Sequence, residues 1–342
     1  MKIFTFSCKK MLIAVLLLML IVKVNAQTDS ALIRRVPVDT STQKLNMDAL
    51  HSRPALTVRK LPIAIGGYLE ANTQYAATDG VSEGFSFQFR RMSVFLSSTI
   101  GERIKFLSEI EFEDGTEEIN LEYASVEIEF HPLVNLNMGI ILNPIGSFNQ
   151  NHDGPKWDFI DRPISSTTIL PATLSNVGFG LHGKYFVRSW VLGYEAYLTN
   201  GLDDHIISNT ENRTSLAAGK SNPEKFEESN SGIPMFTGKI AIRNRKIGEL
   251  GLSFMTGVYN KWKEDGIVLD EKRSAGAAAI DFTTSQFNDR LSITTEWAKT
   301  FVNVPDTYSQ AFGSRQFGAF VDIVGTIVKH KMLGWQNAKI NL

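Results

Sequence analysis

The sequence predicts an all-β fold, an antiparallel transmembrane β-barrel of at least twelve strands that follows a signal peptide. Three observations predict it: an export signal at the start, apolar and polar residues that alternate with period two, and connections that are short and long in turn. Composition excludes two other classes. The 35 Lys and Arg balance 36 Asp and Glu, which gives no electrostatic reason to expect a nucleic-acid partner. A hydrophobic share of 43% is too high for a disordered chain.

Residues 1–26 have the three zones of a secretory signal peptide. Three lysines precede an apolar run over residues 11–22, and Val24-Asn25-Ala26 forms a cleavage site. The run is shorter than the roughly 20 residues that a membrane-spanning helix needs. Cleavage removes Cys8, the single cysteine, so we expect an exported, acidic protein without cysteine. Residues 27–62 are polar and have no sustained period, which predicts a periplasmic leader or linker.

Alternation with period two begins near residue 63, and the predicted barrel covers residues 63–342. In the segment 133–143, for example, Val134, Leu136 and Met138 alternate with asparagines, which gives a strand two unlike faces. The expected strands are 65–75, 86–100, 103–113, 118–130, 133–143, 177–187, 189–200, 235–244, 248–260, 274–284, 289–302 and 315–328. Residues 331–342 read as the opening of a thirteenth strand, so we expect either a truncated chain or a closure of another kind.

The connections between these strands are sorted by length. The connections after even-numbered strands are tight turns, whereas those at 76–85, 144–176, 201–234, 261–273 and 303–314 are long; only residues 114–117 break the rule. Outer-membrane barrels have short turns on one rim and long loops on the other. The strands of a soluble β-sandwich also alternate apolar and polar residues, but nothing in that fold requires short connections at one end and long ones at the other.

The stretch from Phe85 to Gly183 resembles a known family. The matching features are Phe87-Gln88-Phe89-Arg90-Arg91, the acidic strand 108–113, Glu122-Tyr123-Ala124, Asn143-Pro144 before a long loop, and the glycine-rich segment 177–183. This set is similar to the phosphate-selective porin O/P-like outer-membrane proteins, in the version common in the Bacteroidetes. The resemblance implies an outer-membrane porin for anions such as phosphate. Two features depart from the family: Asn143 stands where a basic residue is frequent, and the family's barrels have more than twelve strands.

Charged residues on the polar faces of the strands are the candidates for a pore lining. They are Arg90, Arg91, Lys105, Glu109, Glu111, Glu127, Glu129, His182, Lys184, Glu195, Lys239, Arg243 and Glu296. Selective pores set their potential with rings of one charge sign, and this set is mixed. Arg90 and Arg91 are the first choice for an anion contact, because guanidinium matches phosphate geometry. Only one of the two can face inward unless a bulge intervenes.

The long 144–176 loop is stiff and aromatic. Its candidate constriction residues are Trp157, Asp158, Phe159 and Arg162. A loop of this length is usually functional or disordered. We expect it either to fold inward and narrow a pore, or to stand outside as a lid or an attachment surface.

Motifs for catalysis and metal binding give no positive prediction. The spacing Gly178-x-Gly180-x-x-Gly183 matches a dinucleotide fingerprint, but a strand follows it where the fingerprint needs a helix. No Gly-x-Ser-x-Gly elbow is present. His152-Asp153 and Asp203-Asp204-His205 lie in long loops and could touch a cation, but without a third ligand in the sequence we expect solvated loop charge.

The sequence therefore predicts a non-enzymatic porin without a cofactor, in the outer membrane of a Gram-negative bacterium. Its expected partners are outer-membrane lipid and small hydrophilic solutes or anions, and a homotrimer is one assembly that this prediction allows. Two alternatives stay open. One is a non-conducting barrel whose long loops bind a surface partner, and the other is a soluble exported β protein whose apolar faces meet in a core.

Overall fold

The computed structural model describes residues 56–57, 63–220, 222, 224–332 and 335–342. The predicted signal peptide and most of the predicted leader lie outside the described residues. Fourteen strands form one sheet, and the hydrogen-bonded order follows the chain. They are β1 (Leu56–Thr57), β2 (Ile63–Thr78), β3 (Val81–Ile100), β4 (Ile104–Glu113), β5 (Glu118–His131), β6 (Val134–Leu142), β7 (Ser175–Val187), β8 (Trp190–Thr199), β9 (Met235–Asn244), β10 (Gly248–Val258), β13 (Ser274–Gln286), β14 (Leu291–Val302), β15 (Arg315–Met332) and β16 (Trp335–Asn341).

The remaining elements are short and lie in the connections. β11 (Lys263–Glu264) pairs with β12 (Ile267–Val268) in a small separate sheet. The helical turns are η2 (Asp114–Thr116), η3 (Asn149–Asn151), η4 (Gly154–Lys156), η5 (Ser165–Ile169), η6 (Asp204–Ile206) and η7 (Leu216–Lys220). Within the described part of the chain, no helix has the length and apolar character to cross a membrane.

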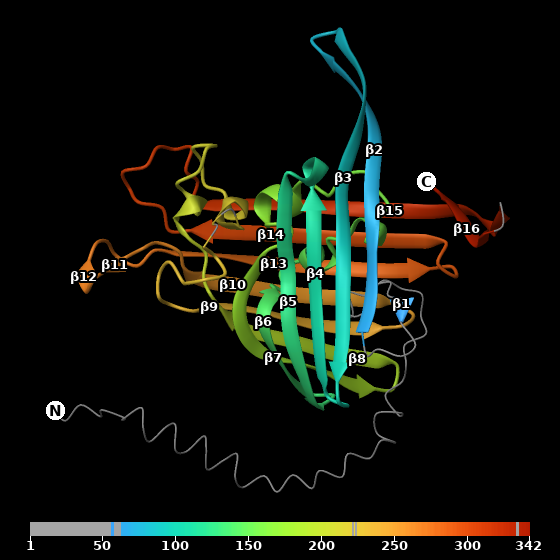
Figure 1. The fold of residues 1–342 in the computed structure, drawn as a ribbon, viewed down its shortest axis with the longest axis horizontal. Coiled ribbons are helices and arrows are strands. Elements are labelled where there is room, and N and C mark those ends of the chain that lie inside the picture. The colour runs from blue at the N-terminus through green and yellow to red at the C-terminus, as the bar shows by residue number, and fades with distance from the viewer. Residues whose placement is uncertain (1–55, 58–62, 221, 223, 333–334) are drawn as a thin grey trace, which may run out of the picture. The chain divides into compact units, whose positions relative to one another are not determined.

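All strand pairs in the large sheet are antiparallel, which confirms the predicted all-β antiparallel fold. The twelve predicted strands coincide with β2 to β10 and β13 to β15, and β16 continues into the predicted thirteenth. From β2 to β15 the strands of this sheet have 9 to 20 residues, enough for a tilted membrane crossing of about 9–11 residues. Figure 1 shows the row bending so that, in this view, β2 to β5 run across β9 to β15.

The expected long loop at residues 76–85 is wrong. These residues continue β2 and β3 as a long hairpin that turns at Asp79-Gly80, and β1 adds a short strand inside the predicted leader. Asp79 and Gly80 both have positive φ, 50° and 82°, as a two-residue hairpin turn of the primed type requires. The other long loops are present at residues 143–174, 200–234, 259–273 and 303–314.

Along the strands, the polar side chains are buried and the apolar side chains are exposed. In β9, Thr237, Lys239 and Arg243 are buried. Their neighbours Phe236 and Ile240 are exposed, Ile240 by 60%. A soluble sheet would bury its apolar face. We call the buried side of the sheet the inner face; the opposite, apolar side suits contact with lipid.

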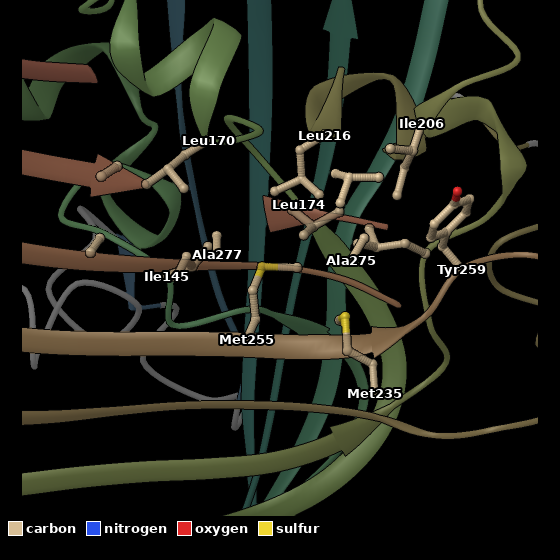
Figure 2. Packing of buried hydrophobic residues seen from close by; sticks show 14 of the residues in the cluster. Ile145, Leu170, Leu174, Ile206, Leu216, Met235, Met255, Tyr259, Ala275 and Ala277 are labelled. Carbon is tan, nitrogen blue, oxygen red and sulfur yellow. The ribbon is translucent and has the colours of Figure 1, made fainter. Parts of the chain in front are cut away.

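One part of the inner face is apolar and receives two of the long loops. Small or flexible residues of β9, β10, β13 and β14, such as Met235, Met255 and Ala277, form its floor. Leu174, Ile206 and Leu216 come from the connections or their margins and pack in the same cluster (Figure 2). The loops at 143–174 and 200–234 are therefore held against the inner face.

The inverted pattern predicts unequal effects of one substitution at two exposed isoleucines. Ile240→Arg in the middle of β9 should lower the free energy of unfolding from phospholipid vesicles by about 2–4 kcal/mol, because folding carries arginine from water to the bilayer centre. Ile247→Arg in the turn after β9, where Ile247 is 54% exposed, should cost only about 0–1 kcal/mol. Urea titration of the vesicle-bound protein measures both. Equal, near-neutral effects would mean that Ile240 faces water.

Candidate functional site

The inner face carries a continuous set of charged side chains, because the register sets them opposite one another on neighbouring strands. Lys105 lies opposite Glu127, and Lys105 pairs with Glu129. His182 lies opposite Glu195, with its Nε2 3.5 Å from Glu127 Oε2. Strands β8 and β9 bring Glu195 opposite Lys239, and β13 and β14 bring Asp281 opposite Glu296.

Both arginines of the Arg90-Arg91 pair reach the inner face because β3 contains a bulge. Glu70 and Ala71 of β2 pair with Arg91 and Phe89, so Arg90 is the extra residue. Arg90 Nη1 lies 3.3 Å from Glu70 Oε1, and Arg91 Nε lies 3.1 Å from Glu70 Oε2. Both arginine side chains therefore bind the Glu70 carboxylate. In a regular strand, consecutive residues point to opposite faces, so without the bulge only one of the two could do so.

The arginine pair is compensated by further carboxylates. Arg91 also lies 3.3 Å from Glu111 and 3.4 Å from Glu113, and Tyr68 donates a hydrogen bond to Glu111 at 3.2 Å. Arg90 binds the carbonyl of Ile160 at 2.9 Å and the Asp161 carboxylate at 3.1 Å. These contacts commit both guanidinium groups to partners within the protein, which weakens the predicted anion contact.

The connection at residues 143–174, called the inner loop below, crosses the inner face. At one end Lys239 donates to the Gly146 carbonyl at 2.8 Å and to Asp281 at 2.8 Å. Gly146 donates its backbone N–H to Ser253 at 2.9 Å. Glu296 accepts hydrogen bonds from the Ser147 backbone at 2.7 Å and the Ser147 hydroxyl at 3.0 Å.

The next part of the inner loop reaches strands β4 and β8. Gln150 donates to Glu195 at 3.0 Å, and His152 lies 3.4 Å from Glu109. Arg162 donates to the His152 carbonyl at 3.0 Å. Through these contacts the loop connects β13 and β14 with β4 and β8, so it lies between distant parts of the sheet.

The four predicted constriction residues separate into two pairs. Trp157 packs edge-on against Phe148 with ring centroids 5.7 Å apart, and the Arg162 guanidinium lies 5.9 Å from the Trp157 ring. Asp158 and Phe159 are exposed. The structure therefore brings only Trp157 and Arg162 toward the inner contacts of the loop.

None of the thirteen predicted lining residues is exposed: each is buried or half-buried. Sequence reasoning missed several further charged residues of the inner face. These are Glu70, Glu113, Glu122, Glu249 and Asp281. Asp281 lies between Ile280 and Phe282, a signal that the neighbouring alanines of β13 hid because alanine fits either face.

Burial also shifts the pKa values of charged side chains in the loops. Burial lowers the pKa of Arg162, and the neighbouring Arg91 lowers it further, while Glu111 and Glu113 act in the opposite direction. Burial raises the pKa of Asp203, against the hydrogen bond that its carboxylate accepts from the His205 backbone. These loop groups are therefore held away from bulk water.

Comparison with known proteins gives distant likenesses. No family model matches the chain. A protein of Aquifex aeolicus (strain VF5), described as uncharacterized, is 29% identical over 215 residues, which are 60% of this chain and 46% of that protein. The chain thus spans about half the length of this relative.

Solved structures with a similar run of strands are outer-membrane proteins. The outer-membrane channel DcaP of Acinetobacter baumannii has a TM-score of 0.38 and 12% identity, over 78% of this chain and 88% of that chain. OmpT of Vibrio cholerae, in a trimer form, has a TM-score of 0.33 and 9% identity, over 81% and 92%. OmpF of Salmonella typhi in complex with daunomycin has a TM-score of 0.33 and 8% identity, over 82% and 96%.

Lys239 should be a main anchor of the inner loop. Lys239→Met leaves Asp281 buried without this cation, so we expect a loss of about 3–5 kcal/mol in the free energy of unfolding. The control Lys246→Met changes an exposed lysine in the turn after β9 and should stay within about 0.5 kcal/mol of the wild type. Urea titration in vesicles compares the two. A Lys239 variant as stable as the control would contradict the buried ion pair.

Proposed function

We propose that this protein is an outer-membrane β-barrel channel through which small hydrophilic solutes diffuse. One observation carries the proposal: the inner face is charged and the opposite face is apolar. An apolar exterior suits lipid, and a charged interior suits water and polar solutes. The proposal includes cleavage after residue 26 and closure of the strand row into a barrel. The export signal and the alternation of short and long connections agree with an outer-membrane location.

The proposed mechanism is selection by width and by the charge of the lining, without a chemical reaction. The inner loop narrows the path, because its contacts with Lys239, Glu296 and Glu109 hold it across the inner face. Assembly as a homotrimer stays a prediction from the sequence.

For charge selectivity we propose a preference for cations. Among the buried side chains of the described residues, carboxylates outnumber lysines and arginines. Arg90 and Arg91, the residues expected to contact phosphate, already bind Glu70, Glu111, Glu113 and Asp161. A negative lining lowers the energy of a cation and raises that of an anion. The resemblance to phosphate-selective porins implies the opposite preference.

Current across a planar bilayer tests this proposal. The refolded protein should give discrete conductance steps, and under a KCl gradient the reversal potential should have the sign of cation preference. An anion preference that falls in Arg90→Ala and Arg91→Ala would instead favour the phosphate-type channel. Absence of steps from protein whose folding is verified by heat-modifiable gel migration would exclude diffusion through it.

A second candidate is the non-conducting barrel that presents its loops to a partner. The apolar cluster favours it, because residues of two long loops pack against the inner face as a protein core does. The substitution Glu296→Ala distinguishes the two functions. It removes the acceptor for Ser147 and Ser166 and should raise the unit conductance of a channel by loosening the inner loop.

Glu129→Ala is the matched control for this experiment. Glu129 also lies on the inner face, and it pairs with Lys105 rather than with the inner loop. The control removes one lining charge without releasing the inner loop, so its unit conductance should stay much closer to the wild-type value than that of Glu296→Ala. Equal conductance in both variants would mean that the inner loop does not limit the current.

A further inference from the structure

Three side chains that can bind metals meet where the inner loop contacts β4. His152 and Asp153 belong to the loop, and Glu109 belongs to the middle of β4. The Nε2 atom of His152 lies 3.4 Å from Glu109 Oε2 and 3.7 Å from Asp153 Oδ1. The side chains of His152 and Glu109 are 0% exposed and that of Asp153 is 3% exposed.

The hydrogen bond at the other ring nitrogen places one proton of the imidazole. His152 Nδ1 lies 3.0 Å from the Asn149 carbonyl oxygen, which can only accept a hydrogen bond. Nδ1 must therefore carry a proton. Metal-binding histidines commonly donate their second nitrogen to a backbone carbonyl in this way, which fixes the ring and directs the lone pair of Nε2 toward the metal.

We propose that Glu109, His152 and Asp153 bind a divalent transition metal ion of the Zn²⁺ type. Ligand atoms about 2.0–2.1 Å from a tetrahedral zinc lie about 3.3 Å from one another, close to the two distances from His152 Nε2. One imidazole nitrogen and two carboxylate oxygens are a ligand set that zinc accepts, with a fourth position for water. Asp153 presents Oδ1 to this site, while its Oδ2 lies 3.2 Å from Lys156.

The metal would fasten the inner loop to the sheet. Two ligands lie on the loop and the third lies 43 residues earlier, on β4. A bound ion would therefore add a strong connection near the contacts of Gln150 and Arg162, to a strand other than the one that carries Lys239. This inference goes beyond the proposed channel, because metal binding is measured without current.

A competing arrangement has no metal. With a second proton on Nε2, His152 would be an imidazolium between two carboxylates. Together with Lys156, which lies 3.2 Å from Asp153, the charges would balance by ion pairing alone. Both arrangements explain the burial of the three groups. Only the first predicts stoichiometric, saturable binding of zinc that depends on all three side chains.

The test uses the full chain folded in detergent micelles and freed of metal with a chelator. Titration with Zn²⁺ in a calorimeter should show one site for each chain. Co²⁺ should bind at the same site and give visible absorption bands that Zn²⁺ abolishes. Glu109→Gln and His152→Gln should each weaken Zn²⁺ binding by at least about tenfold, as loss of even an outer-shell partner commonly does.

His182→Gln is the matched control. This histidine also faces a carboxylate of the inner face, Glu127 at 3.5 Å, and lies outside the cluster. Its Zn²⁺ affinity should stay within about twofold of the wild type, below the effect of changing a group next to a metal. Heat-modifiable migration verifies that each variant folds, and Asp153→Asn replaces any variant that does not.

Two results would overturn the proposal. One is the absence of saturable Zn²⁺ binding to the folded wild-type protein, which would leave the imidazolium arrangement. The other is binding of equal strength in the wild type and in the folded ligand variants, which would place the ion elsewhere on the chain.

Discussion

Hydrocarbon offers no hydrogen-bond partner to a peptide group, and in the proposed membrane location this constraint explains most of the architecture. A strand that crosses a bilayer must pair its backbone with neighbouring strands. The continuous antiparallel pairing meets that requirement for the strands between the two ends of the row, and the proposed closure would extend it to the ends. Each strand must then separate lipid from water by alternating its side chains, and β9 does so at nearly every position. The inverted burial of polar and apolar residues follows from the solvent on each side.

Side chains buried on the inner face of such a sheet must either pair their polar groups or pack apolar groups together. This protein combines two solutions: ion pairs and hydrogen bonds around Lys239 and Glu296, and an apolar cluster around Met235 and Met255. Buried ion pairs add little net stability, but removing one partner is costly because a buried charge is left behind. Such contacts fix where the inner loop lies. The apolar cluster contributes the favourable burial that holds it there.

The sequence predicts the strands well because period two is a local property. All twelve expected strands are present. Where the alternation is clean, the polar residues of a strand are the buried or half-buried ones, and their role in lining a pore stays a prediction. The hairpin at Asp79-Gly80 has a local signal as well, because these residue types accept positive φ. In β13, alanine fits either face, so the inward position of Asp281 is hidden.

Other features depend on contacts that no local pattern records. The bulge that turns both Arg90 and Arg91 inward arises from the register between β2 and β3. Glu109 and His152 are neighbours only because the inner loop folds back over β4. His152-Asp153 is recognisable in the sequence as a pair that could touch a cation. Glu109, the third member of the cluster, cannot be recognised without the tertiary fold.

The central claim is that one face of the sheet contacts lipid and the other does not. Cys8 is the single native cysteine, so a chain with Cys8→Ser can carry one new thiol at a time. A fluorescent label on cysteines introduced along β9 should be quenched by brominated lipid at positions 236, 240 and 242. Labels at positions 237 and 241, which are buried on the inner face, should not be quenched. Quenching without alternation, or at none of these positions in verified folded protein, would contradict the account.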